Sequence, residues 1–306
     1  MKPFIFFIYD KKSYLPEIFA YEKHCKENSI SYKIVDSSFD FKKINEPHIK
    51  WTFMGLDLKK NKNSFIVHEY LSLSIGRFKK TKNYIKKYLS TKPDIQIFLN
   101  ETIRNTFHIN GIPYTIRDMG IDDAFFKNTI GINKEYDFCY CGSMDKSREI
   151  DKLLDLFTSG VFKNNTILLL GSAPKDLTNK YHNENIHFHG KVDYTDVPRI
   201  LSKAKCAINY IPNKYPFNIQ TSTKFLEYLA LGLPVISTKY HWVDKFQEKN
   251  KFSCSYLHEL TELSITTLIN SKYTAPDMSE FKWKNIIKNS KVFDIVIEGF
   301  NKKFNI

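Results

Sequence analysis

One apolar helix of the sequence carries two opposite charges near its start. In TSTKFLEYLALGLPVIST, residues 221–238, the only charged side chains are Lys224 and Glu227, and hydroxyl residues fill positions 221–223. A helix N-terminus presents backbone N–H groups and the positive end of the helix dipole to an anion. These hydroxyls and Lys224 are therefore suited to phosphate oxygens, although Ser and Thr at such a position can also simply cap the helix.

Glu227 is the less obvious member of the pair. Residues three positions apart lie on one face of a helix, so an ion pair with Lys224 at the surface is one alternative. Most of the neighbouring residues, such as Phe225, Leu226 and Leu229, are apolar, which disfavours an exposed pair. We therefore expect the two charges to serve a ligand rather than each other.

The rest of the candidate site comes from loops that follow four expected strands. In an open parallel sheet, ligands bind beyond the carboxyl ends of the strands. Glycine there lets the backbone approach a ligand closely, and small hydroxyl residues can contact phosphate oxygens. The four loops are residues 142–144, which are followed by Arg148, and residues 171–174, 190–192 and 212–220. Together with the cations Arg148 and Lys224, they resemble a diphosphate site.

Short apolar strands that alternate with amphipathic helices position these loops. The alternation runs through both halves of the chain and is typical of parallel sheets with crossover helices. A polar stretch without periodicity, residues 125–137, separates the halves and predicts two α/β domains in series. Strands are expected at 3–9, 31–35, 50–54, 64–68, 94–99, 113–117, 137–141, 166–170, 186–189, 205–210, 233–237 and 252–255. Helices are expected at 14–28, 78–90, 101–107, 147–158, 195–203, 221–231 and 257–269, with two more after residue 279.

The composition is that of a soluble globular protein. Hydrophobic residues make up 42% and charged residues 26% of the 306 residues, and this length allows two domains with cores of their own. The apolar runs are far shorter than the roughly 20 residues of a membrane-spanning helix. The first residues lack a signal-peptide cleavage site, so a cytoplasmic protein is expected.

The formal charge of +13 can reflect an AT-rich genome, which the many Asn, Ile and Lys residues suggest, but one segment is unusually basic. Residues 77–92 contain seven Lys and Arg residues and no acidic residue, while Ile85, Tyr88 and Leu89 share one helical face. This pattern predicts a helix that binds an anionic membrane surface, where each well-placed cation contributes about 1 kcal/mol. The alternative is an ordinary solvated surface helix. No nucleic-acid-binding motif accompanies the basic segment, so no nucleic-acid partner is expected.

Four segments of the second half resemble the nucleotide-sugar-binding domain of GT-B glycosyltransferases, in particular the retaining group called family 4, or group 1. They are YDFCYCGSMDKSREIDKLLDLF (136–157), NTILLLGSAP (165–174), IHFHGKVDYTDVPRILSKAKCAINYIP (186–212) and TSTKFLEYLALGLPVIST (221–238). Their order and spacing carry the resemblance. SFIVHEY (64–70), IPYTIRDMGIDDAFF (112–126) and FKWKNII (281–287) match the family more loosely, so the resemblance spans nearly the whole chain.

The resemblance implies an α/β fold of the GT-B type, in which two Rossmann-like domains face each other across a cleft. The acceptor-side domain would comprise residues 1–127, a linker residues 128–136, and the nucleotide-sugar-binding domain residues 137–288. The last residues, 289–306, would form a helix that packs back on the first domain.

Carried over position by position, the resemblance also implies roles for single residues. Arg148 and Lys224 would neutralise the diphosphate of a sugar nucleotide, and Glu227 would accept hydrogen bonds from its ribose. His68 would contact the donor sugar, unless it is merely a satisfied histidine at the end of a strand. His68, Arg148 and Lys224 are thus the candidate catalytic residues. The other donor-binding candidates are Gly142, Ser143, Gly171, Gly190, Lys191, Val192, Thr221, Ser222 and Thr223.

The chain departs from the family pattern at three places. Ile219 stands where the family commonly has a second glutamate, and Ser143 stands where it usually has an arginine. The first loop, residues 9–16, contains no glycine. These differences concern the donor sugar and the acceptor contacts.

The implied function is transfer of a sugar from a nucleotide-diphosphate sugar to a saccharide acceptor, expected to be lipid-linked, in the synthesis of lipopolysaccharide, capsule or another surface polysaccharide. The chain has no Asp-x-Asp motif, so metal-independent, retaining transfer without a cofactor is expected at the inner face of the cell membrane. Two alternatives stay open. One is a sugar-nucleotide epimerase with His68, Glu69 and Asp118 as acid and base groups, and the other is a catalytically silent nucleotide-sugar-binding subunit.

Overall fold

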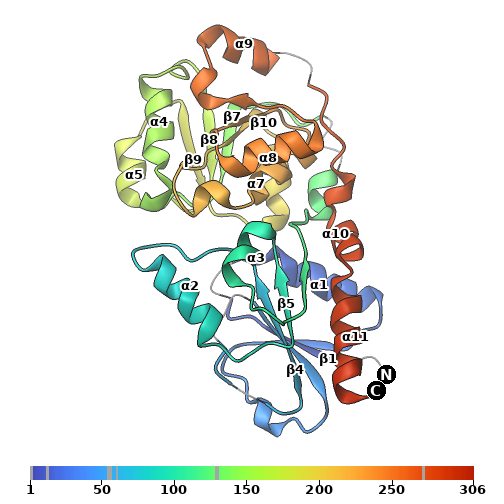
Figure 1. Cartoon of the computed structure of the whole chain (residues 1–306). Coiled ribbons are helices and arrows are strands. Elements are labelled where there is room, and N and C mark those ends of the chain that lie inside the picture. The colour runs from blue at the N-terminus through green and yellow to red at the C-terminus, as the bar shows by residue number, and fades with distance from the viewer. Residues whose placement is uncertain (1–2, 12–13, 54–56, 60, 128–130, 271–272) are drawn as a thin grey trace. The chain divides into compact units, whose positions relative to one another are not determined.

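The protein folds into two compact α/β units. The computed structural model describes residues 3–11, 14–53, 57–59, 61–127, 131–270 and 273–306. Unit 1 is made of Met1–Asp122 and Phe281–Ile306, and unit 2 is Asp123–Glu280 (Figure 1). Each unit contains a six-stranded parallel sheet with helices in the crossovers, which confirms the predicted α/β class with two Rossmann-like sheets.

The sheet of unit 1 has the strand order β2-β1-β3-β4-β5-β6. Its central strands are buried on both faces, as expected where helices cover a parallel sheet on both sides. The strands are β1 (Phe4–Ile8), β2 (Tyr32–Val35), β3 (His48–Phe53), β4 (Ser64–Tyr70), β5 (Ile95–Phe98) and β6 (Tyr114–Ile116). The helices are α1 (Pro16–Glu27), α2 (Lys79–Tyr88), α3 (Glu101–Phe107), α10 (Trp283–Ser290) and α11 (Val292–Phe304).

Two faces of this sheet are covered by different helices. Tyr21 of α1 contacts the ring of Phe293 in α11 on one face, and Phe107 of α3 stacks on Tyr70 of β4 on the other (Figure 1). The last helix, α11, packs on β4 and β5, so residues from the end of the chain complete the core of unit 1.

The sheet of unit 2 has the strand order β12-β11-β10-β7-β8-β9. The chain builds outward from β7 to β9, then returns to the other side of β7 with β10, so the order reverses between β7 and β10. The strands are β7 (Tyr136–Cys141), β8 (Ile167–Leu170), β9 (Ile186–Gly190), β10 (Ala204–Asn209), β11 (Val235–Ser237) and β12 (Ser255–Tyr256). The helices are α4 (Ile150–Thr158), α5 (Lys175–Lys180), α6 (Val197–Leu201), α7 (Thr223–Ala230), α8 (His241–Asn250) and α9 (Glu262–Asn270).

The two parts of unit 1 are joined by a short parallel bridge. Ile121 donates its N–H to the carbonyl of Phe281 at 2.8 Å, and its own carbonyl accepts from Trp283 at 3.2 Å. The chain therefore leaves and re-enters unit 1 at neighbouring positions. The units change at Asp122 and Glu280, whereas the sequence placed the boundaries at 127 and 288. Residues 128–130 of the expected linker lie outside the described residues.

All twelve expected strands are present, but two helices were not predicted. The helix α5 is only six residues long and polar, so it lacks an apolar period. The helix α8 buries Val243 and Phe246 but is otherwise mostly polar. Within the described residues, no helix combines the length and the apolar character that a membrane span would require.

Candidate functional site

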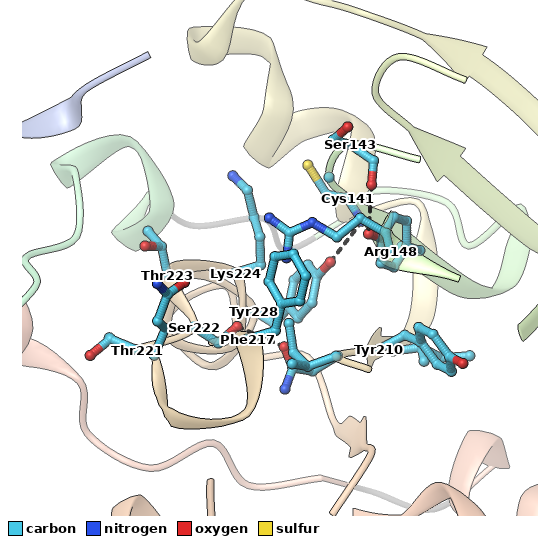
Figure 2. Close-up of a pocket in the computed structure, with 16 residues that line it drawn as sticks. Cys141, Ser143, Arg148, Tyr210, Phe217, Thr221, Ser222, Thr223, Lys224 and Tyr228 are labelled. Carbon is cyan, nitrogen blue, oxygen red and sulfur yellow. Dashed lines mark hydrogen bonds between the residues drawn. The ribbon is translucent and has the colours of Figure 1, made fainter. Parts of the chain in front are cut away.

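A cavity of about 310 Å³ opens at the switch point of unit 2. Its walls come from the carboxyl ends of β7 and β10, the segment that leads into α7, and the start of α7 itself (Figure 2). A reversal of strand order leaves a crevice between the two diverging crossovers, and ligands of such sheets bind there. The residues that line it are Tyr140, Cys141, Gly142, Ser143, Arg148, Ile208, Asn209, Tyr210, Ile211, Phe217, Gln220, Thr221, Ser222, Thr223, Lys224 and Tyr228.

Seven of the candidate residues from the sequence line this pocket. They come from the segment after β7, from the segment before α7 and from α7 itself, and they include both predicted phosphate-binding cations. They are Gly142, Ser143, Arg148, Thr221, Ser222, Thr223 and Lys224. The lining as described contains two cations and no Asp or Glu side chain, so the pocket is electrostatically suited to an anion.

Arg148 is held at the pocket by a turn and by an aromatic ring. It ends the short 3-10 helix η3 (Lys146–Arg148), whose start is capped by the Asp145 side chain accepting from the N–H of Ser147 at 2.9 Å. Its guanidinium lies over the ring of Phe217, 4.5 Å from the centroid, as Figure 2 shows. A planar guanidinium stacks well on an aromatic face, which leaves its edge N–H groups available to a ligand.

The start of α7 is held by hydrogen bonds to residues at the ends of neighbouring strands. Ser222 is its N-cap and accepts from the N–H of Phe225 at 3.2 Å, while its own hydroxyl donates to Asn209 at 2.7 Å. Asn209, at the end of β10, donates in turn to Ser237 and Tyr240. The hydroxyl of Ser222 therefore serves the cap, and Thr221 and Thr223 on either side remain at the pocket wall.

The structure corrects the expectation that Lys224 and Glu227 do not pair. The Nζ of Lys224 lies 2.5 Å from Oε2 of Glu227. The pair is not the exposed one considered above, since the Glu227 side chain is only 1% exposed and that of Lys224 is 32% exposed. A carboxylate buried to this degree requires a countercharge, and Lys224 is one turn away.

The pair also fixes the charge of Lys224. Burial alone would lower the pKa of this ammonium group, but the adjacent carboxylate of Glu227 outweighs it and holds the pKa above its usual value. Lys224 is therefore positively charged at neutral pH. Its side chain extends into the same pocket as that of Arg148 (Figure 2).

The glycines that end three neighbouring strands make backbone contacts with each other. The N–H of Gly142 donates to Leu170 and that of Gly171 to Gly190, each at 2.9 Å. A Cβ on Gly171 would lie 2.0 Å from the carbonyl oxygen of Gly142, and its φ of +138° is one that side chains rarely adopt. Gly171 is thus required for the packing of these loops. Of these three glycines, Gly142 is among the described residues that line the pocket, whereas Gly171 and Gly190 are not, and neither are Lys191 and Val192.

His68 belongs to unit 1, where it lies inside β4. It is 4% exposed, its Nε2 is 3.7 Å from Oδ2 of Asp57, and its Nδ1 is 3.4 Å from the hydroxyl of Tyr70. Its neighbour Glu69 is fully buried and accepts from Trp51 at 2.7 Å while paired with Arg117. The carboxylate of Glu69 is therefore occupied by structural contacts.

Several pocket residues were not identified from the sequence. Asn209 was detectable, because a polar residue ends an otherwise apolar strand at the edge where ligands bind. Tyr228 was not, because it reads as one more apolar position of α7, yet its hydroxyl accepts from the N–H of Cys141 at 2.7 Å and ties α7 to β7. Phe217 and Tyr210 lie in or beside a loop without periodicity. Burial raises the pKa of Tyr210 to about 12, so its hydroxyl is neutral.

The described residues contain no group of three His, Cys, Asp or Glu side chains placed to hold a metal ion. The polar groups of the pocket are instead ammonium, guanidinium, hydroxyl and amide groups. These are donors for an anion, whereas Mg²⁺ is bound by carboxylate and carbonyl oxygens.

Known proteins share the fold described above, and a known protein family matches the region around the pocket. Residues 135–255 match the sequence model of the family described as glycosyl transferases group 1. This range includes β7 to β11 and every residue of the pocket. No curated protein sequence matches the chain.

Solved structures resemble the whole fold at low sequence identity. The sucrose-phosphate synthase of Thermosynechococcus elongatus matches with a TM-score of 0.60 at 12% identity, covering 100% of this chain and 98% of its own. HepE of Anabaena, in complex with UDP and glucose, matches with a TM-score of 0.58 at 11% identity and the same coverage.

TarM of S. aureus, in complex with fondaparinux, alpha-GlcNAc-glycerol and UDP, matches with a TM-score of 0.59 at 17% identity over 87% of this chain. The present chain covers 57% of the TarM chain, so it spans little more than half the length of that protein. The chain therefore has the fold of the GT-B glycosyltransferases, and its residues 135–255 are similar to the family described as glycosyl transferases group 1.

Proposed function

We propose that this protein is a glycosyltransferase that moves a sugar from a nucleotide-diphosphate sugar to a saccharide acceptor. The observation that carries the proposal is the convergence of Arg148, Lys224 and the start of α7 on one pocket. Two cations and a helix N-terminus match the charge and size of a diphosphate. The group 1 family match covers this same pocket, and the HepE and TarM complexes contain UDP.

The two cations act on the leaving group. Transfer breaks the bond between the anomeric carbon and a diphosphate oxygen, and the departing diphosphate gains negative charge. Arg148 is held beside the pocket by Phe217 and Lys224 lines the same pocket, so both cations can stabilise this charge. We propose that the enzyme retains the anomeric configuration, and that a diphosphate oxygen takes the proton of the attacking acceptor hydroxyl.

The proposal includes no metal and no cofactor. The pocket supplies cations, hydroxyls and a helix N-terminus where a metal-dependent site would supply carboxylates. The nucleotide sugar is a co-substrate. Gly142 and Ser143 would lie beside its phosphates, the backbone at 190–192 would meet its base, and Glu227 its ribose.

The proposed acceptor is a lipid-linked saccharide of a surface polysaccharide, reached at a membrane surface. The support is the helix α2, which leaves four large apolar side chains of its region exposed: Phe78, Tyr84, Tyr88 and Leu89. Cations Arg77, Lys80 and Lys82 are exposed beside them. Exposed aromatic residues among lysines are the composition of an interfacial helix, whereas an ordinary surface helix would bury its aromatic residues.

Binding of sugar nucleotides tests the proposed site. We expect UDP-glucose, or another sugar linked to UDP, GDP or ADP, to raise the melting temperature of the protein. Arg148→Ala and Lys224→Ala remove one cation each. Each variant should bind that ligand at least tenfold more weakly, because the side chain that it lacks would form a charge-assisted hydrogen bond to the diphosphate. Calorimetric titration of the variants measures the loss.

The matched control is Lys245→Ala. Lys245 forms the same i,i+3 ion pair, with Glu248, but on the exposed surface of α8. This variant should bind like the parent protein. If none of the sugar nucleotides binds, or if Arg148→Ala and Lys224→Ala bind as tightly as Lys245→Ala, the assignment of the pocket is wrong.

A further inference from the structure

The carboxylate of Glu227 is closed off from the pocket that Lys224 and Tyr228 line. Its Oε2 accepts from Lys224 at 2.5 Å and its Oε1 accepts from the hydroxyl of Tyr194 at 2.9 Å. With both oxygens engaged, the side chain is 1% exposed, and it contributes nothing to the pocket lining although residues before and after it in α7 do.

Tyr194 reaches Glu227 from a different element. It begins the 3-10 helix η4 (Tyr194–Asp196), which follows β9, and the chain turns there at Gly190 with a φ of +87°. The side chain is half-buried; its ring packs on Phe125 at 5.5 Å, and the ammonium of Lys224 lies 5.6 Å from the ring centroid. Glu227 is thus held by its own helix, and Tyr194 by a short turn at the surface.

A diphosphate in the pocket would compete for the cation of Glu227. Lys224 lines the pocket, so an entering diphosphate draws its ammonium away from Oε2. A buried carboxylate that loses its cation is costly unless other donors replace it. Hydroxyl groups are suitable replacements, because an ionised carboxylate only accepts and has about four acceptor positions. A ribose offers two neighbouring alcohol hydroxyls, whereas inorganic pyrophosphate has no such pair.

We infer that Tyr194 is a gate for the ribose of the donor, whose hydroxyl occupies in the free protein the position that a ribose hydroxyl takes on Glu227. This inference rests on the proposed function, since it concerns the nucleotide of the same pocket. Entry of the nucleotide then exchanges both partners of Glu227 in one event: Lys224 turns to the diphosphate, and Tyr194 gives way to the ribose.

The gate makes the protein prefer a nucleotide over a bare diphosphate. Pyrophosphate would bind Lys224 in place of Glu227 and would leave the carboxylate without a replacement hydrogen-bond donor. A nucleoside diphosphate takes the same lysine but supplies two hydroxyls, so the buried carboxylate stays hydrogen-bonded throughout. Selection for the nucleoside thus arises at Glu227, on the far side of Lys224 from the phosphates.

Tyr194→Phe tests the gate, because it keeps the ring on Phe125 and removes only the competing hydroxyl. We expect the Kd of UDP to fall roughly threefold to tenfold, the value of one hydrogen bond that no longer has to be broken. The Kd of pyrophosphate should stay the same or rise. Titration calorimetry of the full chain measures both, with ADP and GDP in parallel so that the tightest-binding nucleotide is compared.

The control is Tyr181→Phe, which removes a tyrosine hydroxyl that donates to Asp155 at 2.6 Å in the same unit and outside the pocket. It should leave the affinities for nucleotide and pyrophosphate unchanged. If Tyr194→Phe binds UDP as weakly as the parent or more weakly, Tyr194 supports Glu227 in the bound state and the gate is refuted.

A crystal structure of the parent protein with the nucleotide provides a second measurement that needs no variant. We expect the hydroxyl of Tyr194 to have left Glu227 and a ribose hydroxyl to be bound there. Retention of the Tyr194 hydrogen bond beside a bound ribose would overturn the inference but leave the proposed function standing. Failure of every nucleotide to bind would instead overturn the proposed function, and the gate with it.

Discussion

The two cations of the pocket contact different kinds of partner, one a charged carboxylate and the other an aromatic ring. Lys224 is held by a buried carboxylate, whereas the contact that the structure shows for Arg148 is with the face of Phe217. A lysine ammonium is a compact charge that can change partners, while a guanidinium on a ring keeps its orientation. Arg148 is therefore the fixed cation of the site and Lys224 the one that exchanges.

This difference gives a prediction for Phe217, a residue that sequence reasoning missed. Phe217→Leu keeps an apolar side chain but removes the ring beneath Arg148. We expect the affinity for UDP to fall about twofold to fivefold, the value of a cation–π contact at a partly exposed site. Calorimetry of the single and double variants checks the cause: in the Arg148→Ala background, Phe217→Leu should have no further effect. An equal loss in both backgrounds would show that the ring acts on the pocket by another route.

Among the elements, α2 is attached to unit 1 by a side chain that its sequence pattern does not single out. Of the predicted apolar face, Ile85 is half-buried and Tyr88 and Leu89 are exposed, whereas Asn83 is buried. The side chain of Asn83 accepts a hydrogen bond from the N–H of Ser74 at 3.0 Å, so a polar contact attaches α2 to the rest of unit 1. Tyr84 and Tyr88 are left 62% and 57% exposed, with their rings 4.7 Å apart.

We expect α2 to bind vesicles that contain phosphatidylglycerol and not vesicles of phosphatidylcholine alone. Lys80→Glu with Lys82→Glu should reduce binding more than tenfold at low salt, because each exposed cation near an anionic surface contributes about 1 kcal/mol. Tyr84→Ser with Tyr88→Ser should reduce binding at high salt as well, since apolar insertion is not screened. Vesicle sedimentation measures both. Equal binding by the parent and both variants would exclude α2 as the membrane surface.

At the scale of the whole molecule, the chain returns to unit 1 at a point where Trp283 packs closely against Gly120. A Cβ on Gly120 would lie 2.3 Å from Cδ2 of Trp283, so only glycine allows the start of α10 to pack here. The guanidinium of Arg117 lies over the ring of the same tryptophan, 5.0 Å from its centroid. Arg117 is fully buried between Glu17 and Glu69, which connects α1, β4, β6 and α10.

Gly120→Ala should therefore destabilise unit 1. We expect a loss of about 1–3 kcal/mol in the free energy of unfolding, the cost of forcing extra volume into a packed core. Urea denaturation followed by Trp fluorescence measures it. In a Trp283→Leu background the substitution should cost much less, because the smaller side chain leaves room for the added methyl group. If Gly120→Ala lowers the free energy of unfolding by the same amount in that background, the added methyl group does not clash with Trp283.

The sequence predicts the sheets well because parallel strands buried on both faces appear as plain apolar runs. It also predicts the cations of the pocket, because Lys224 stands out in an apolar helix and Arg148 follows the loop at the end of an expected strand. It does not predict the partners of those charges: Tyr194 lies 33 positions from Glu227, and no local pattern brings the two together. Phe217 and Tyr228 were missed for a related reason, because an aromatic residue that supports a site looks like one that fills a core.

The bridge between Ile121 and Lys282 has a consequence for synthesis on the ribosome. Unit 2 is contained within the chain of unit 1, so every residue of unit 2 emerges before the last two helices of unit 1 do. Domains generally fold as units during translation. Unit 1 must therefore wait, with the face of β4 and β5 that α11 covers still open, while unit 2 can complete its core. We expect the pocket of unit 2 to form on the nascent chain before unit 1, whose first strands are synthesised earlier, has closed its core.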